Sequence, residues 1–135
     1  MRYFTLLILL ALGLASCKKD EVDAKQTLPE VSTIQRMVTG VNGPTSGAVN
    51  QELSFTLLWP NANNQNYFDH LNATTVANTL HIKLFAATDT TNQQTERQQS
   101  AVFKFKADAP GTYYLKFPKP GNDSTYSIVD TVTIR

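Results

Sequence analysis

The chain of 135 residues contains a single cysteine, Cys17, close to its amino terminus. A thiol can carry a lipid through a thioether bond, and the residues before this one are Leu14, Ala15 and Ser16. They end an apolar run that begins at Phe4 and is too short to span a bilayer. A charged start, a short apolar run and small residues are typical of a signal peptide. We therefore expect a signal peptide at the amino terminus; the alternative for Cys17 is a free thiol in a transmembrane or signal segment.

Residues 14–17 resemble the lipobox of bacterial lipoproteins, in which an aliphatic residue and two small residues precede the cysteine. The resemblance implies that Cys17 is acylated and begins the mature chain. Each buried methylene contributes about 0.8 kcal/mol, so several acyl chains hold a protein on a membrane almost permanently. Residues 1–16 are then a signal peptide, and residues 17–29, which are mostly polar or charged, form a flexible tether.

Four charged residues follow the cysteine: Lys18, Lys19, Asp20 and Glu21. This arrangement resembles the surface-export signal of Bacteroidota lipoproteins, a lysine and two acidic residues just after the lipidated cysteine. The resemblance implies that the protein is anchored in the outer membrane and exposed at the cell surface. The alternative is an ordinary charged tether, with the domain facing the periplasm.

The charge balance narrows the classes of partner. Removal of residues 1–16 takes away Arg2 alone among the charges, so 12 basic and 11 acidic residues become 11 and 11. A neutral chain with no basic run beyond the tether argues against nucleic acid as a partner, because such binding requires a concentrated positive surface. Residues 30–135 suffice for one small domain with a single core, which we expect to be a monomer without disulfides.

Alternation of apolar and polar residues with a period of two marks the strands of this domain. Regular strands are expected over residues 51–58, 79–85, 101–107, 112–117 and 126–134, with a less regular one over residues 31–41. Turn-forming glycine, proline, asparagine and aspartate residues separate several of these runs. The spacing predicts an all-β protein, an antiparallel β-sandwich of about seven strands, with a small open barrel as the alternative.

The segment Gly111-Thr112-Tyr113-Tyr114-Leu115 resembles the start of strand F in immunoglobulin-like domains. Tyr113 takes the position of the tyrosine corner, whose hydroxyl binds a backbone group just upstream. Leu115 stands where an antibody domain has its second cysteine. The resemblance implies a disulfide-free immunoglobulin-like sandwich, similar to the single domains that Bacteroidota surface lipoproteins carry behind a tether.

Motifs for catalysis or metal binding are not evident. The sequence has no Gly-x-Ser-x-Gly motif, phosphate loop or calcium loop. His81 is expected on the outward side of a strand, and no pattern supplies His70 with further metal ligands. Asp130 alternates inward with apolar residues, where we expect an amide of a neighbouring strand or of a turn to bind its carboxylate. We therefore predict no enzymatic activity, no catalytic residue, no metal and no cofactor.

Residues 59–78 are rich in asparagine and also contain Trp59, Tyr67, Phe68 and His70. We expect a long loop, with a single helical turn in its second half as the alternative. Aromatic faces stack on sugars and amides bind hydroxyl groups, so these four residues are candidates for binding a glycan or an envelope protein. The alternative is that Trp59 and Phe68 close one end of the core.

Three short triplets, Asp89-Thr90-Thr91, Asp123-Ser124-Thr125 and Asp130-Thr131-Val132, resemble the O-glycosylation signal of extracytoplasmic Bacteroidota proteins. Thr131 of the third triplet is expected in a strand, whereas Thr90 and Ser124 are expected in exposed loops. The resemblance makes Thr90 and Ser124 candidate acceptors, although the same residue types commonly form turns.

Taken together, the sequence predicts a lipid-anchored, non-catalytic binding or accessory module. The alternative is a structural or adhesive surface protein with no small-molecule site.

Overall fold

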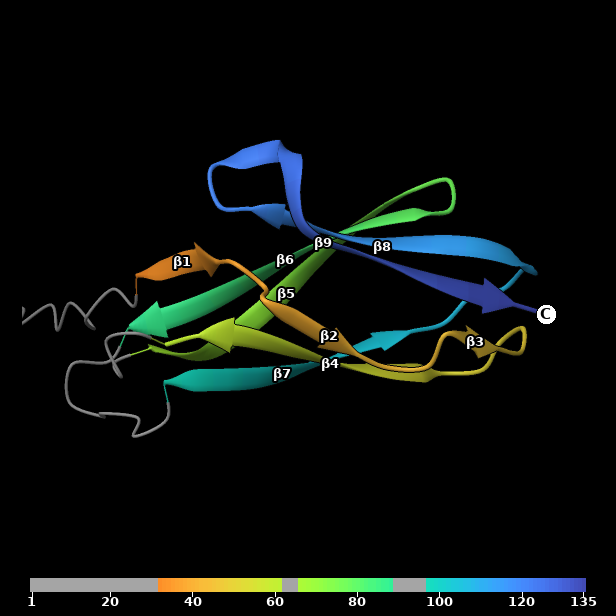
Figure 1. Ribbon diagram of the computed structural model, residues 1–135, viewed down its shortest axis with the longest axis horizontal. Coiled ribbons are helices and arrows are strands. Elements are labelled where there is room, and N and C mark those ends of the chain that lie inside the picture. The colour runs from red at the N-terminus through yellow and green to blue at the C-terminus, as the bar shows by residue number, and fades with distance from the viewer. Residues whose placement is uncertain (1–31, 62–65, 89–96) are drawn as a thin grey trace, which may run out of the picture.

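The computed structural model describes residues 32–61, 66–88 and 97–135 (Figure 1). These residues contain no helix, and so none that could cross a membrane. The strands are β1 (Thr33–Arg36), β2 (Gly40–Asn42), β3 (Ser46–Gly47), β4 (Leu53–Pro60), β5 (Asn66–Val76), β6 (Thr79–Thr88), β7 (Gln98–Phe105), β8 (Gly111–Lys119) and β9 (Asn122–Ile134).

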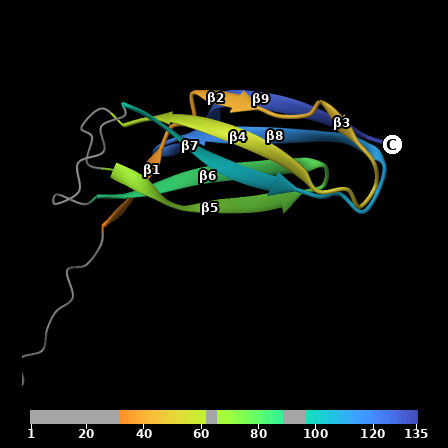
Figure 2. The same ribbon diagram turned by 90° about the horizontal axis from the view of Figure 1, so that it is seen from below.

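The strands form two sheets that pack face to face (Figures 1 and 2). The large sheet has the order β1-β6-β8-β9-β3, with β5 paired to β6, and the small sheet has the order β2-β4-β7. The all-β sandwich is therefore confirmed, with nine strands in place of about seven. The irregular strand expected over residues 31–41 is divided into β1 and β2, and β3 and β5 are additional.

The core lies between the sheets and follows the alternation of the sequence. In β4, Phe55, Leu57 and Trp59 are fully buried, while the residues between them are exposed or half-buried. The Phe55 ring lies against Phe103 of β7, with 6.5 Å between the ring centroids. The inward side chains of the large sheet are Leu80, Ile82, Leu84, Tyr113, Leu115, Phe117, Val132 and Ile134. Burial of each large apolar side chain contributes about 1.5–3 kcal/mol, which supports a core without a disulfide.

The tyrosine corner is confirmed. The Tyr113 hydroxyl donates a hydrogen bond to the carbonyl oxygen of Ala109, at 2.9 Å. Gly111 has a φ of 151°, a conformation that side-chain-bearing residues rarely adopt. A Cβ there would also lie 3.3 Å from Nδ2 of Asn78, in the turn between β5 and β6. Glycine at this position thus permits both the corner and the close approach of the turn.

The order of one hairpin differs from the immunoglobulin arrangement. There, the strand that follows the B-type strand lies beside strand F in the opposite sheet. Here β5 follows β4, but β6 lies beside β8, with Leu80 opposite Leu115 in a parallel pair. β3 and β9 form a second parallel pair, so the large sheet is mixed. Because β6 takes the place beside β8, β5 lies at the edge of the large sheet and pairs with β6 alone among the described strands.

The long loop expected over residues 59–78 was wrong, as was its helical alternative. Most of this segment is β5, which forms a hairpin with β6 through Ala77 and Asn78. The strand was missed because it has no alternating pattern: from Phe68 to Val76 every residue except half-buried Leu71 is exposed. An edge strand that extends past the opposite sheet does not need alternating apolar residues.

Candidate functional site

The outward face of the large sheet presents a row of side chains from β5, β6 and β8, in which exposed Val76 and Tyr114 lie on either side of half-buried Thr79. Pairing places Val76 opposite Thr79, and Thr79 opposite Tyr114. Val129 of β9 is a diagonal neighbour of Tyr114, because Tyr114 pairs with Thr131. Val76, Tyr114 and Val129 are 63%, 42% and 51% exposed. Since backbone pairing holds these strands, the surface exists before any partner binds.

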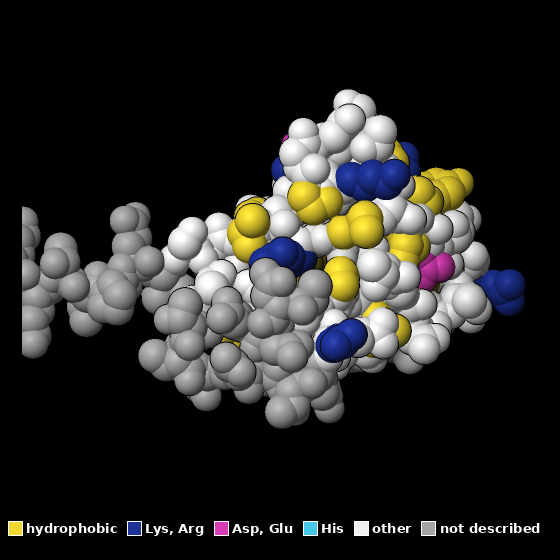
Figure 3. Space-filling model, turned by 60° about the vertical axis from the view of Figure 1, so that its left-hand side comes forward, with side chains coloured by type: hydrophobic (Ala, Val, Ile, Leu, Met, Phe, Trp, Pro, Cys, Tyr) yellow, Lys and Arg dark blue, Asp and Glu magenta, His cyan; other side chains and the backbone are white. Residues whose placement is uncertain are grey.

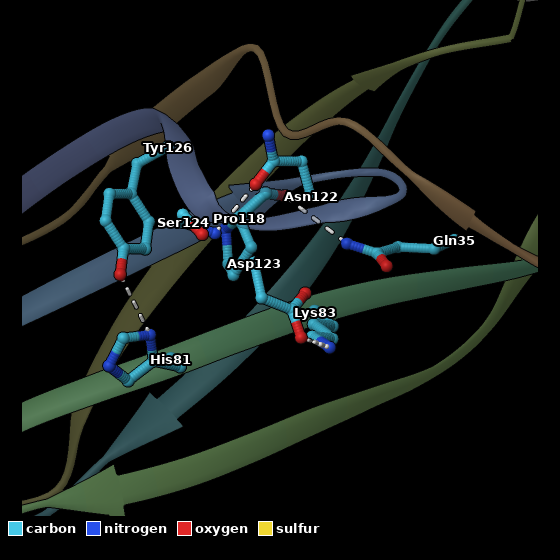
Figure 4. A network of polar contacts seen from close by, with 8 residues as sticks. All are labelled: Gln35, His81, Lys83, Pro118, Asn122, Asp123, Ser124 and Tyr126. Carbon is cyan, nitrogen blue, oxygen red and sulfur yellow. Dashed lines mark hydrogen bonds and ion pairs between the residues drawn. The ribbon is translucent and has the colours of Figure 1, made fainter.

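The end of the β8–β9 hairpin bends over the outward face of β6 (Figures 1 and 4). Nζ of Lys83 lies 2.7 Å from Oδ2 of Asp123. The Tyr126 ring packs against His81, with 5.7 Å between the centroids and the hydroxyl 3.5 Å from Nδ1. The Lys116 ammonium lies 5.2 Å from the centroid of the Tyr126 ring. We call these five residues the tip network.

Local chemistry explains why the hairpin bends. The β8–β9 register shifts on both sides of Pro118, and such irregularities bend a strand pair. Proline has no backbone N–H to donate, while its carbonyl oxygen accepts a hydrogen bond from Nε2 of Gln35 at 3.3 Å. At the turn, Oδ1 of Asn122 accepts a hydrogen bond from the backbone N–H of Ser124 at 2.9 Å (Figure 4). The tip is therefore held to both β1 and β6.

His70 lies farther along the same face. Its ring stacks on Phe85 of β6, with 4.7 Å between the centroids and planes 8° apart. Nδ1 of His70 lies 2.5 Å from Oδ2 of Asp69, and both side chains remain partly exposed. The β5–β6 register shifts between Phe68 and His70, so Asp69 is the extra residue of a bulge. The bulge turns His70 outward while Phe68, opposite buried Ala86, faces inward.

The four residues proposed to bind a ligand do not converge. Trp59 is 0% exposed and packs in the core, so its ring cannot stack on a ligand in this conformation. Tyr67 is half-buried, and Phe68 is 39% exposed on the inward side of the edge strand. His70 is exposed on the outward face. For Trp59, the alternative of a core plug matches the structure.

Asparagines of the same segment have a structural role where β4 leads into β5. Nδ2 of Asn61 donates to the carbonyl oxygen of Asn66 at 2.9 Å, and Oδ1 of Asn61 accepts from the Asn66 backbone at 3.2 Å. Thr88 donates to Oδ1 of Asn66 at 3.1 Å. Both asparagines are buried, so these hydrogen bonds satisfy polar groups that would otherwise destabilise the fold.

Other predicted sites fall in different places. Cys17, the charged residues 18–21 and Thr90 lie outside the described residues, as do the expected signal peptide and tether. Ser124 is exposed near the start of β9, just after the hairpin turn, and so lies in a strand in place of the loop expected for it. Oδ1 of Asp130 accepts a hydrogen bond from the backbone N–H of Thr131 at 2.9 Å, so its partner is the next residue of β9 in place of the neighbouring strand or turn expected for it. The described part of the chain contains no group of three or more residues suited to hold a metal ion.

Exposed apolar side chains also occur away from the outward face. Ile34 and Met37, within and just after β1, are 49% and 38% exposed. On the side of the molecule that carries β1, hydrophobic side chains alternate with lysine and arginine (Figure 3). Scattered apolar residues of this kind are common on soluble domains, whereas a row fixed by strand pairing is a more specific feature.

Sequence patterns indicate the residues of the outward face less clearly than those of the core. Alternation alone places Tyr114 outward, but it does not say which side chains from other strands lie beside it. The pairs Lys83–Asp123 and His81–Tyr126 join residues 40 and 45 positions apart. No family model matches the chain, and neither the curated proteins nor the solved structures contain a significant match.

Proposed function

We propose that this protein is a lipoprotein, anchored in the outer membrane through Cys17 and displayed at the cell surface. Its domain acts as a non-catalytic binding module whose ligand is another envelope protein. The anchor rests on the lipobox-like residues 14–17 and the charged residues 18–21. The observation that carries the binding role is the row formed by Val76, Thr79 and Tyr114, with Val129 beside it.

The surface favours a protein over a glycan as the ligand. Trp59, the strongest candidate for stacking on a sugar, is in the core. What remains exposed is one tyrosine with two valine side chains near it, and half-buried Thr79 and Lys116 lie beside the tyrosine. Tyrosine is enriched at protein interfaces because it combines apolar area with a hydroxyl group. A preformed surface of this composition fits a folded partner.

Crosslinking in intact cells tests the binding role. A photoreactive amino acid at Tyr114 should yield one defined adduct with another envelope protein. The matched control is the same substitution at Val102, which is 57% exposed on the outward side of the small sheet. If no adduct forms, or if both positions give the same adducts, the outward face is not the binding surface. A structural surface protein without a specific ligand would then remain.

Fractionation tests the anchor separately. Cys17→Ser should move the protein out of the detergent-soluble membrane fraction, because the thioether cannot form. Protease added to intact cells should digest the wild-type domain but spare a Lys19→Ala/Asp20→Ala/Glu21→Ala variant that remains inside. Digestion of both proteins would show that residues 18–21 are not the export signal.

The intact mass of the native protein tests Thr90 and Ser124. A mass equal to that of the chain plus its lipid rules out glycosylation at both residues.

A further inference from the structure

β5 presents an open backbone edge to solvent. It pairs with β6 on one side, and no other described strand pairs with it. Beyond the bulge at Asp69, residues 70–76 are regularly paired with β6 and are exposed except at Leu71. In Figure 2 this strand lies at the margin of the large sheet, past β7 of the small sheet. We call residues 70–76 the free edge.

The free edge lacks the features that normally prevent strands from pairing between molecules. Such protection comes from short strands, charged residues, proline or bulges. β1, β2 and β3 are short, and β7 carries Lys104, which is ion-paired with Glu52. Residues 70–76 contain no proline, aspartate, glutamate, lysine or arginine. The one acidic residue of β5, Asp69, belongs to the bulge that begins this segment.

The free edge is complementary to itself. If two copies of residues 70–76 overlap fully in antiparallel orientation, Ala73 faces its own equivalent at the two-fold axis. Asn72 then faces Thr74 of the second copy, and Leu71 faces Thr75. Amide, hydroxyl and small apolar groups meet with no like charges opposed, and the two Asp69 side chains lie at opposite ends. Antiparallel pairing keeps inward residues opposite inward residues, so the large sheets continue into each other.

We propose that two copies of this protein pair through residues 70–76 of β5, as an antiparallel dimer with Ala73 on the two-fold axis. The occupant of the free edge is a second copy because the segment, which contains no aspartate, glutamate, lysine or arginine, matches itself in face and register without opposing like charges. Two-fold pairing also closes the assembly, since it uses both open edges. The dimer replaces the monomer expected from the sequence, and it does not depend on the protein ligand proposed for the outward face.

The strength of this contact follows from its length. Seven residues at about 3.3 Å each give a contact roughly 23 Å long, which is small for a specific protein interface. Pairing is therefore expected to be weak in dilute solution. It is favoured where both copies are held on one surface, because confinement raises their effective concentration. This last point alone rests on the proposed lipid anchor.

Cysteine crosslinking of the full chain in cell envelopes tests the register. Directly opposed Cβ atoms in an antiparallel pair are about 4.5–5.5 Å apart, within reach of a short bis-maleimide. Ala73→Cys should give a band of twice the monomer mass. The wild type controls for unlipidated Cys17, and Val102→Cys controls for an exposed residue on β7, an edge strand of the small sheet. No homodimer at Ala73→Cys, or equal yields at both positions, overturns the proposal.

Charge exchange separates self-pairing from other causes of crosslinking. Asn72 and Thr74 are exposed, so their replacement should leave the core intact. Since Asn72 lies opposite Lys83 of β6, circular dichroism of each variant checks that its fold is unchanged. In the Ala73→Cys background, Asn72→Lys/Thr74→Lys opposes lysines twice across the interface and should reduce dimer yield about tenfold. Asn72→Asp/Thr74→Asp should do the same alone, and co-expression of the two variants should restore the band. Full crosslinking of either variant alone, or no recovery on co-expression, contradicts the proposed pairing; adducts to another protein would identify a different occupant.

Discussion

β4 and β5 are consecutive strands, yet the chain uses them in different ways. β4 is the central strand of the small sheet, and its inward side chains are all buried. β5 is longer, but it is an edge strand, and only Asn66 in it is buried. The two strands show that a strand can be fixed by core packing or by the pairing of its backbone with a single neighbour.

The contrast between β4 and β5 shows which parts of the two strands are accessible to a partner. β4 has strands on both sides, and its side chains hold the two sheets together. β5 is held by β6 and has most of its side chains and one backbone edge exposed. Core strands are therefore constrained by packing, while edge and surface positions remain open for recognition.

Hydrogen exchange should give the largest difference between the two strands. Residues 56–58 of β4 are paired on both sides, so their amides should exchange only through global unfolding, which costs about 5–15 kcal/mol in typical domains. The amides of residues 70–76 that point away from β6 should exchange nearly without protection in dilute protein. Equal protection in both strands would contradict the contrast. Protection of β5 that appears on concentration, and is lost in Asn72→Lys/Thr74→Lys, would support the dimer.

Removal of one apolar side chain from each strand should give the next largest effect. Phe55 is fully buried between the sheets, so Phe55→Ala should lower the free energy of unfolding by about 3–5 kcal/mol. Leu71 is half-buried at the edge, so Leu71→Ala should cost clearly less, about 1 kcal/mol. Chemical denaturation of both variants measures the difference. Similar losses would show that the inward side of β5 is packed as tightly as the core.

The turns beside the two strands offer a smaller test. Ala77, after β5, has a φ of 51°, and Asn50, before β4, has a φ of 63°. The left-handed conformation costs alanine about 1 kcal/mol, whereas asparagine adopts it more readily. Ala77→Gly should therefore raise the free energy of unfolding by about 0.5–1 kcal/mol, and Asn50→Gly should change it by a few tenths. If Asn50→Gly raises the free energy of unfolding as much as Ala77→Gly does, this explanation is refuted.

The same contrast shows what the sequence could reveal. The buried faces of β4, β6 and β8 are visible as alternation, because each faces the core on one side only. The tyrosine corner is also local, since Tyr113 and Ala109 are four residues apart. Extension of the β4 alternation from Leu57 by two residues places Trp59 inside, so a signal for its burial was present.

Other features depend on relations that no local pattern carries. β5 has no alternation, because the small sheet does not cover most of it. The tip network needs the bend at Pro118, which brings Asp123 to Lys83 across the outward face. The parallel pairing of β6 with β8 decides that Tyr114 lies beside Thr79. These relations arise from tertiary packing, which also determines the surface that we propose for binding.

The smallest expected effect concerns the charged pair beside β4. A charged residue on an edge strand hinders pairing between molecules, and residues 70–76 of β5 have no such pair. Nζ of Lys104 in β7 lies 2.8 Å from Oε1 of Glu52, next to β4. The hydrogen bond to Glu52, and then its charge, raise the pKa of Lys104. Glu52→Gln should lower this pKa toward its usual range, as measured by NMR titration of the lysine side chains.

The direction of the pH effect follows from the raised pKa. The stabilising contribution of this pair is fully present below the pKa that Lys104 has in the unfolded chain, and it is lost as the pH rises through the higher folded-state pKa. Both side chains are more than half exposed, so salt should weaken the effect. Asp108→Asn, a substitution at another exposed acidic residue near β7, is the matched control and should leave the Lys104 titration unchanged. An unchanged titration in Glu52→Gln would mean that Lys104 protects the β7 edge as a solvated charge, without its partner.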